Sequence, residues 1–486
     1  MRERSRAAKR AFGLLLLLAG AAACAGSHGA APGLPYAQPQ LGGAKSKIAH
    51  VVVIIQENRS FDNFFATFPG ADGTRTGKAA AMPPSIASAC KKPITKATTI
   101  PLQEVSLVGD GSDINHDHAA FTTSLDSGAM DGFDLNFFGG GGGGPPTCTY
   151  AYQYVNPSEI QPYWEIAKQY VLADHTFQTQ GSGSFTAHQD LIAGGTDISG
   201  NEALIDTPTF FPWGCDANPP VRTAIIKKSD GKVYRYGGPF PCLQYATMRD
   251  LLDAKGVSWK FYAMPVQKES GCYHGNTAGI WSAFDAIKAV RYSPEWHKNV
   301  SRGNLVFFKD VAKGTLPAVS WITPDSLNSD HPGVTKHGPC QNGGQPGDTG
   351  PSWVASLVNA IGESPYWKST AIVVVWDDWG GFYDHAVPPH PRDWEGGPGF
   401  RVPMLVIAPY VKAHVEHTVY SFGSILKFVE GTFGLGSLGT SDATSTSIGN
   451  AFDFSMQPRT FKKIPAKYSR EYFLQQPPSG APPDTQ

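Results

Sequence analysis

A run of five β-branched residues at positions 51–55 is followed at once by Gln56, Glu57, Asn58 and Arg59. A continuous Val/Ile run of this kind is typical of a strand that is buried on both faces in a parallel sheet. Ligands of open α/β sheets bind outside the carboxyl ends of the strands. Two interpretations follow. Either the polar residues form an ordinary strand end in contact with water, or Glu57 and Asn58 point into a functional site.

Four further apolar runs resemble the first. The run at 372–376 ends directly before Asp377 and Asp378, "AVSWITPD" ends at Asp325, and "GVSWKFYAM" and "PMLVIAPYV" are less polar at their ends. Helical patterns lie between the runs, such as "IQPYWEIAKQYV" with its apolar stripe and "SILKFVEGTFG", which closes at a glycine. Strands that alternate with helices predict an α/β fold with a mostly parallel central sheet flanked by helices.

Three carboxylates and one amide follow strands of this predicted sheet: Glu57, Asn58, Asp377 and Asp378. Neighbouring parallel strands bring such ends together, and carboxylates gathered without a cation repel one another. Oxygen ligands suit a hard ion such as Ca²⁺, Mg²⁺ or Mn²⁺. By itself, an aspartate pair after a strand is usually only a solvated turn. The combination of the two strand ends instead predicts one divalent metal ion, whose identity stays open.

The N-terminus predicts export. Basic "MRERSRAAKRAF" precedes the short apolar core "GLLLLLAGAAA" and small residues, which indicates a signal peptide over 1–24. Cys24 then has two interpretations: a lipoprotein cysteine that anchors the chain to a membrane, or an incidental cysteine after a cleaved signal. We expect a flexible tether over 25–47, one folded domain over 48–470 and a disordered tail over 471–486.

Charge and cysteine content narrow the class of protein further. The 40 basic and 41 acidic residues give no whole-chain argument for binding nucleic acid or an anionic membrane. Without Cys24 an even number of cysteines remains, which suits an oxidising compartment. They allow 15 connectivities, with Cys215–Cys242 as the most local pair. No two cysteines have the close spacing of a zinc site. The set is Cys90, Cys148, Cys215, Cys242, Cys272 and Cys340.

Several motifs occur in order along the chain: "QENRSFDNFF", "MDGF", "GSFTAHQDLIAG", "SWITPD" with "SDHP", "WDDWGGFYDHAVPP" and "GFRVPMLVIAPYVK". With these motifs the chain resembles the bacterial phosphoesterase family that contains phospholipases C and the acid phosphatase A type, within the alkaline phosphatase superfamily. The match extends from about residue 48 to "NAFDF" at 450–454. The resemblance implies an alkaline-phosphatase-like fold with loop-rich insertions and a phosphoesterase catalytic domain over 48–470.

The resemblance also implies roles for single residues. Glu57 and Asn58 in "ENRSFD" match metal ligands of the family, and Asp377 and Asp378 in "WDDWGG" match the remaining protein ligands. "SGSFTAHQ" aligns with the nucleophile segment, which makes Ser184 the nucleophile.

The nucleophile segment departs from the family pattern. Ser182, Gly183 and Thr186 replace the usual Gly, Pro and Pro, so Ser182 is the alternative to Ser184. A serine hydroxyl needs a base or a metal to become a good nucleophile. The segment lacks the G-x-S-x-G pattern of α/β-hydrolase esterases, which argues against that class.

Histidines of the family motifs complete the expected site. His116 in "DINHDHAAF" and His331 in "SDHP" are expected to contact the phosphoryl oxygens or to protonate the leaving group. Four further residues are candidates for holding a ligand in place from behind: His118, His337, His385 and Arg59. For Arg59 we also expect a pairing with a carboxylate at the strand end.

The predicted function is that of an exported, metal-dependent phosphoesterase that acts through a covalent phosphoserine. A serine nucleophile resembles the acid phosphatase branch and favours phosphate monoesters, and the alternative is a phospholipase C that acts on phospholipid head groups. Two hypotheses of other classes stay open, an inactive surface-anchored binding module with the same fold and a serine esterase. The expected location is the periplasm, the outer membrane as a lipoprotein, or the exterior, and no nucleic-acid partner is expected.

Overall fold

The computed structural model describes residues 47–109, 112–139, 142–210, 213–263, 281–303, 305–332, 347–389 and 397–476. The predicted signal peptide with Cys24, nearly all of the tether and the tail from 477 onward lie outside the described residues. Cys272, Cys340 and His337 also lie outside them. The predicted strands and helices of the folded domain lie within the described part, so the fold prediction can be compared with the structure.

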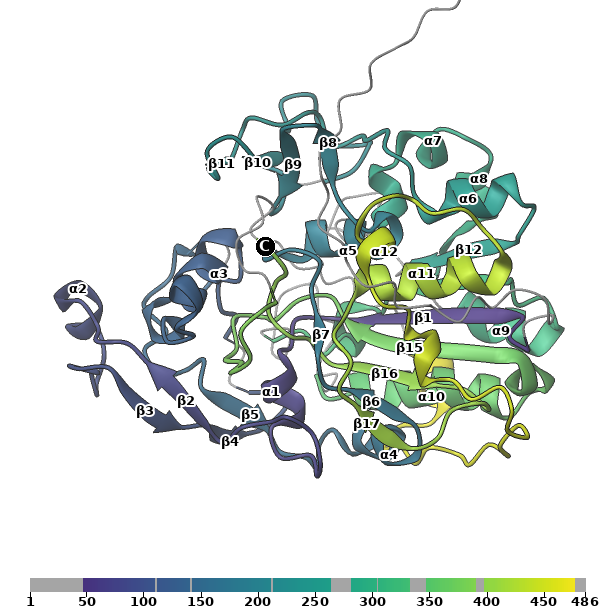
Figure 1. Ribbon diagram of the computed structural model, residues 1–486, viewed down its shortest axis with the longest axis horizontal. Coiled ribbons are helices and arrows are strands. Elements are labelled where there is room, and N and C mark those ends of the chain that lie inside the picture. Colours follow the sequence, from purple (N-terminus) through teal and green to yellow (C-terminus); the bar gives the residue numbers. More distant parts are fainter. Residues whose placement is uncertain are drawn as a thin grey trace, which may run out of the picture. The chain divides into compact units, whose positions relative to one another are not determined.

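The main sheet has eight strands in the order β13-β12-β14-β1-β15-β16-β6-β17. Only β16 runs antiparallel to its two neighbours, β15 and β6, and all other pairs are parallel. This arrangement confirms the predicted α/β fold with a mostly parallel sheet, and Figure 1 shows β1, β15 and β16 side by side. The strands are β13 (Val300–Arg302), β12 (Trp259–Ala263), β14 (Val319–Ile322), β1 (His50–Gln56), β15 (Thr370–Trp376), β16 (Met404–Ile407), β6 (Val171–Ala173) and β17 (His414–Glu416).

Helices cover both faces of the main sheet. Neighbouring residues of a strand point to opposite faces, and in β12 the ring of Tyr262 packs on Phe307 of α9 while Phe261 packs on Phe284 of η5. Helix α10 contacts α9 and α4, and α5 contacts η5 and α11. The sheet is therefore the middle layer of three. The helices named are α4 (Gln161–Gln169), α5 (Ser184–Ala193), η5 (Ala283–Ala286), α9 (Val306–Lys313), α10 (Gly350–Gly362) and α11 (Phe422–Phe433).

Two predicted helices are confirmed with their ends. Helix α4 buries Tyr163 and Ile166 against the core, and α11 ends at Gly434 in the left-handed region, with φ of 62°. The other helical segments are short: α1 (Phe61–Phe65), α2 (Pro84–Ala87), α3 (His118–Leu125), α6 (Met248–Ala254), α7 (Lys288–Arg291), α8 (Glu295–Lys298), α12 (Ser441–Thr444), α13 (Arg470–Gln475), η1 (Asp126–Gly128), η2 (Phe133–Leu135), η6 (Ser326–Asn328), η7 (Pro365–Ser369) and η8 (Ile448–Ala451). No described helix is long and apolar enough to cross a membrane.

Smaller sheets form the insertions. An antiparallel sheet in the order β11-β10-β9-β8 lies at the top of Figure 1, and the pairs β2–β3 and β4–β5 lie on the left. The strands are β2 (Thr76–Ala79), β3 (Thr98–Pro101), β4 (Gln103–Val105), β5 (Gln153–Val155), β8 (Asp197–Ser199), β9 (Glu202–Ile205), β10 (Ala224–Lys227) and β11 (Val233–Tyr234). A last pair joins β7 (Thr176–Phe177) to β18 (Tyr420–Ser421).

Disulfides fasten two of these insertions. Cys215 and Cys242 form the local pair that the spacing favoured, and Cys90 pairs with Cys148 across 58 positions. Both bonds close loops and so restrict the unfolded chain more than the folded one.

Candidate active site

The ends of β1 and β15 lie side by side at one edge of the main sheet. The two strands pair in parallel with Gln56 opposite Trp376, so the residues that follow them leave the sheet together. The backbone N–H of Asn58 donates to Asp377 Oδ1 at 3.1 Å. Glu57, Asn58, Asp377 and Asp378 are all fully buried. The structure thus brings the four predicted ligand residues together.

A glycine makes the close approach of the two strand ends possible. Asn58 has a φ of 52°, in the left-handed region that an asparagine tolerates. A Cβ at Gly380 would lie 2.1 Å from the Asn58 carbonyl oxygen, so only glycine fits there. The Gly380 N–H also donates to Asp378 Oδ1 at 2.8 Å, which fixes the carboxylate. The glycines of "WDDWGG" therefore shape the site.

Ser184 is the first residue of α5, a helix that is buried along its whole length. Its hydroxyl donates to Asp378 Oδ2 at 2.9 Å, and its Oγ lies 3.4 Å from Asn58 Nδ2. The N-terminus of a helix carries a partial positive charge and N–H groups that favour an anion. Ser184 thus lies beside the carboxylate cluster and at an anion-binding end of a helix.

His188 belongs to this site and was missed by the sequence analysis. It lies one helical turn after Ser184, so both side chains project from the same face of α5. Its Nε2 lies 3.1 Å from Glu57 Oε1 and 3.5 Å from Asp377 Oδ2, and all three residues are buried. Ser184 and His188 are four positions apart in "SFTAH", so a helix predicted over this segment would have placed them on the same face.

The electrostatics of the cluster suit a bound cation. Burial and the charges of Asp378 and Glu57 raise the pKa of Asp377 well above its usual range, and the charge of His188 acts in the opposite direction. Asp377 Oδ2 accepts no hydrogen bond within the described part of the chain. Buried carboxylates that repel one another cost free energy unless a positive charge compensates. The residues present therefore fit a divalent metal ion, and His188 adds an imidazole to the predicted oxygen donors.

His116 contacts the same cluster from another segment. Its Nδ1 lies 2.7 Å from the Ile114 carbonyl and so carries the proton, which leaves Nε2 to accept from Asn58 Nδ2 at 2.8 Å. The Nε2 atom is also 3.6 Å from Asp378 Oδ2. A predicted site residue is thus placed within reach of Ser184 and the carboxylates.

His331 and His118 lie around the cluster. The carbonyl of Ser329, two residues before His331, accepts the Glu57 N–H at 2.8 Å, and the His331 ring lies 6.2 Å from that of Trp281. His331 Nδ1 hydrogen-bonds with the Pro332 carbonyl. His118 Nδ1 lies 2.7 Å from the Gly181 carbonyl, so it supports the segment that precedes Ser184.

Arg59 differs from its expected role. The sequence suggested that its guanidinium pairs with a strand-end carboxylate. Instead Nε donates to the Asp330 carbonyl at 2.8 Å, and the other nitrogens bind Asn63 Oδ1 at 3.2 Å and the Leu107 carbonyl at 3.2 Å. The group is buried and also lies over the Phe64 ring. Two of these acceptors are backbone carbonyl oxygens, so Arg59 stabilises the loop after β1.

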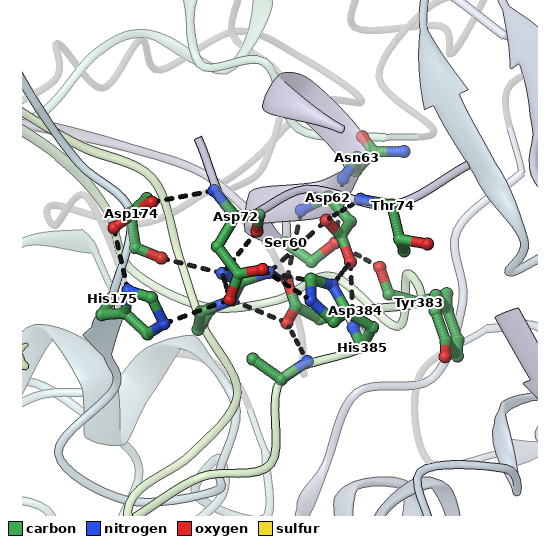
Figure 2. A network of polar contacts seen from close by, with 12 residues as sticks. Ser60, Asp62, Asn63, Asp72, Thr74, Asp174, His175, Tyr383, Asp384 and His385 are labelled. Carbon is green, nitrogen blue, oxygen red and sulfur yellow. Dashed lines mark hydrogen bonds and ion pairs between the residues drawn. The ribbon is translucent and has the colours of Figure 1, made fainter. Parts of the chain in front are cut away.

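His385 takes part in a buried network behind the two strand ends (Figure 2). Its backbone N–H and its Nδ1 both contact Asp62 Oδ2, at 2.9 and 2.7 Å. Arg401 Nε donates to Asp384 Oδ1 at 2.8 Å, and the Asp62 N–H donates to Asp384 Oδ2 at 3.1 Å. Asp62 follows Asn58 and Asp384 follows Asp378 in sequence, so the network ties both ligand-bearing segments together. Arg401 supplies the positive charge that these carboxylates need.

The His385 network predicts a pH-dependent stability. Burial acts to lower the pKa of His385, but the hydrogen bond and charge of Asp62 raise it to about 9. A folded-state pKa above the ordinary 6.5 means that the stabilisation is complete below pH 6.5 and is lost as the pH rises through 9. We expect His385→Gln to lower the free energy of unfolding by roughly 3 kcal/mol at pH 6 and by little at pH 10. Urea unfolding of both proteins at the two pH values measures this, and a pH-independent difference contradicts it.

The sequence is similar to one family of proteins and to several individual proteins. The sequence model of the Phosphoesterase family matches residues 48–436. Phospholipase C B of Mycobacterium tuberculosis is 26% identical over 467 residues, which covers 86% of this chain and 80% of the relative. Non-hemolytic phospholipase C of Pseudomonas aeruginosa is 28% identical over 433 residues, or 80% of this chain and 54% of the relative.

Solved structures of low similarity were also found. A protein of the alkaline phosphatase superfamily from Vibrio parahaemolyticus has a TM-score of 0.34 and 11% identity over 72% of this chain and 70% of its own. The lipoteichoic acid synthase LtaP from Listeria monocytogenes has a TM-score of 0.35 and 11% identity over 83% of this chain and 77% of its own.

Proposed function

The chain belongs to the phosphoesterase family, and from this premise we propose that it cleaves phosphate esters through a covalent phosphoserine at Ser184. In general terms, the chain is a hydrolase that acts on phosphoric ester bonds. The observation that carries the proposal is the contact of 2.9 Å between Ser184 Oγ and Asp378 Oδ2 beside the buried strand-end carboxylates.

In the proposed first step, Ser184 Oγ attacks phosphorus and the ester oxygen leaves on the opposite side. Asp378 Oδ2 orients the hydroxyl through its hydrogen bond, and the N-terminus of α5 binds the phosphoryl oxygens, where negative charge accumulates. As the bond to phosphorus forms, the hydroxyl proton passes from Oγ to Asp378 Oδ2, which already accepts its hydrogen bond. His116 Nε2, 3.6 Å from that oxygen, takes up the proton and passes it to the leaving oxygen.

In the second step, water attacks the phosphoserine from the side that the leaving group has left. The bond from phosphorus to Ser184 Oγ breaks and one proton of the water passes to Oγ, which releases the phosphate product and restores the serine hydroxyl. We assign His331 to the phosphoryl oxygens or to this water. Its loop carries Ser329, whose carbonyl accepts the Glu57 N–H.

The proposed cofactor is one divalent metal ion. Glu57, Asn58, Asp377 and Asp378 would hold it, and when bound it lowers the pKa of a coordinated hydroxyl and polarises a phosphoryl oxygen. His188, 3.1 Å from Glu57 Oε1 and 3.5 Å from Asp377 Oδ2, would supply an imidazole beside these oxygen donors. An imidazole among the donors adds Zn²⁺ to the suitable ions Ca²⁺, Mg²⁺ and Mn²⁺.

The preferred substrate is proposed to be a phosphate monoester. A serine at the nucleophile position supports this choice, because it resembles the acid phosphatase branch of the family. The second candidate is a phospholipase C activity on phospholipid head groups, which the names of the relatives from Mycobacterium tuberculosis and Pseudomonas aeruginosa favour. The two differ in the group attached to the phosphate, which the insertions around the site select.

Hydrolysis of two substrates under the same conditions separates these candidates. We expect kcat/KM for p-nitrophenyl phosphate to exceed that for phosphatidylcholine vesicles by at least about tenfold, the discrimination that one lost set of pocket contacts produces. We also expect vanadate to inhibit, because it mimics the transition state at phosphorus. The reverse ratio identifies a phospholipase C. Turnover of neither substrate supports the inactive binding module, and vanadate-insensitive cleavage of carboxylic esters supports the serine esterase.

We propose that the enzyme acts outside the cytoplasm. The N-terminal sequence and the disulfides Cys90–Cys148 and Cys215–Cys242 support an oxidising compartment. Anchoring through a lipidated Cys24 would keep it at a membrane surface.

A further inference from the structure

A second group of metal-ligating side chains lies at the same edge of the main sheet. Strands β6 and β17 run parallel with Ala173 opposite Glu416, so Asp174, His175 and His417 leave the sheet together. Strand β6 is separated from β15 by β16 alone. Two strand spacings place Asp174 roughly 10 Å along the sheet edge from Asp377. The group is therefore outside the catalytic cluster.

Four side chains converge in this group. Asp174 Oδ1 lies 2.8 Å from His175 Nδ1, and Asp174 Oδ2 lies 2.9 Å from His417 Nδ1. On the other side of the ring, His175 Nε2 lies 3.2 Å from Asp72 Oδ2. Ligand atoms of Asp174, His175 and His417 all lie within 4.8 Å of one another. Figure 2 shows Asp72 between the His175 ring and the His385 network.

The surroundings of the group combine a rigid base with access from solvent. Asp174 is fully buried, and the Asp72 N–H donates to its Oδ2 at 2.8 Å. Burial raises the pKa of Asp174, but the His175 and Asp72 hydrogen bonds outweigh it, so the carboxyl is ionised at neutral pH. The side chain of His417 is 60% exposed and that of His175 24% exposed. An ion can therefore reach a preformed carboxylate between two imidazoles.

We propose that Asp174, His175 and His417 bind a Zn²⁺ ion that is separate from the catalytic metal, with Asp72 orienting the His175 ring from its other nitrogen. Two imidazoles and one carboxylate match the mixed nitrogen and oxygen ligands that zinc prefers, and water would fill the fourth position. Hard ions such as Mg²⁺ and Ca²⁺ prefer oxygen ligands alone and suit this group poorly. Binding displaces any proton on the two imidazoles.

The ion would join the two strand ends that bear its ligands, and Asp72 connects a third segment to them. Asp72 lies in the loop between α1 and β2, and His175 and His417 follow strands β6 and β17. The Asp72 carbonyl also accepts from Arg401 Nη1 at 2.9 Å, so the loop already contacts the network behind the catalytic strand ends. A bound Zn²⁺ thus stabilises the folded chain at the edge strand of the sheet.

Zinc binding by matched histidine variants tests the proposal. The full chain is stripped with a chelator and equilibrated with Zn²⁺ at pH 7.5, and bound zinc is counted by mass spectrometry. His417→Ala removes a proposed ligand. His414→Ala is the control, because His414 lies on β17, the strand that His417 follows, and contacts Glu416 at 3.3 Å instead. His175→Ala is a second removal of a ligand.

We expect wild type and His414→Ala to bind one Zn²⁺ more per chain than His417→Ala and His175→Ala. Zinc should also raise the melting temperature of the first pair more than that of the second. Loss of one ligand should weaken zinc binding by roughly 100-fold or more, because even neighbours of a ligand matter 10–100-fold. Equal zinc content in all four proteins overturns the proposal and leaves the group as ion pairs. Because the comparison is a difference, it does not depend on how many ions the catalytic site binds.

Discussion

Ser184→Ala is expected to lower kcat/KM for phosphate ester hydrolysis by at least about 10³-fold, because the variant lacks the atom that forms the covalent bond. The side chain is small and buried, and the change removes no more than a hydroxyl, which donates to Asp378 Oδ2. The fold should therefore survive the change. Initial rates with p-nitrophenyl phosphate, together with the melting temperature, separate loss of chemistry from loss of structure.

Ser182→Ala is the matched control for this experiment. Ser182 Oγ accepts from the Asp206 N–H at 2.7 Å and donates to Asp206 Oδ1 at 3.2 Å, so it is occupied in supporting the loop. We expect its removal to cost about 1–3 kcal/mol of stability and less than about tenfold in kcat/KM. If Ser182→Ala were inactive and Ser184→Ala fully active, the nucleophile would be Ser182.

Removal of divalent metal is expected to lower turnover by at least about 100-fold, and added metal should restore it. Glu57, Asp377 and Asp378 gather three buried carboxylates in one place, and burial and the charges of Asp378 and Glu57 raise the pKa of Asp377. Metal coordination typically supplies several kcal/mol of charge stabilisation in such reactions. Dialysis against a chelator followed by titration with Mn²⁺, Mg²⁺, Ca²⁺ and Zn²⁺ measures the effect, and full activity after chelation contradicts it.

The variant Asp377→Asn tests the proposed metal site through protein stability, without an activity assay. The change removes a buried charge that Asp378 and Glu57 repel. We expect the metal-free variant to be more stable than the metal-free wild type by about 1–3 kcal/mol. We also expect it to lose the rise in melting temperature that metal gives the wild type. A metal-free variant less stable than wild type would indicate that Asp377 has a structural partner instead.

The convergence of the four candidate ligands was predictable from the sequence. The run at 51–55 and that at 372–376 are long and wholly apolar, so strands were the natural prediction, and polar residues follow both. Parallel pairing of these strands then places Glu57 and Asp377 together with no further assumption. The register of Gln56 opposite Trp376 is known only from the structure, because two wholly apolar runs could also pair one residue out of step.

Other parts of the site could not be derived from local patterns. His188 was missed because the segment around Ser184 reads as a Gly/Ser loop, and only tertiary burial makes it helix α5. Strands β6 and β17 have three residues each, too few for a hydrophobic period. The direction of β16 is likewise not encoded in its apolar run. The contact of Asp62 with Arg401 spans 339 positions and depends on the whole fold.

The role of Arg59 shows a limit of reasoning from charge alone. A cation beside strand-end carboxylates suggested an ion pair. In the structure the Asp330 carboxylate instead accepts from Tyr163 at 2.6 Å, and Arg59 binds the Asp330 carbonyl. The planar guanidinium of Arg59 donates to carbonyl oxygens of a tight loop, and the geometry of such a loop cannot be predicted from residue types.

Direct detection of the phosphorylated serine tests the central claim most sharply. Enzyme mixed with p-nitrophenyl phosphate is quenched with acid within milliseconds and digested, and the peptides are sequenced by mass spectrometry. The account predicts one added phosphate on Ser184 during turnover, absent before mixing and absent in Ser184→Ala. Phosphate on a different residue, or none on any residue while product accumulates, would contradict it.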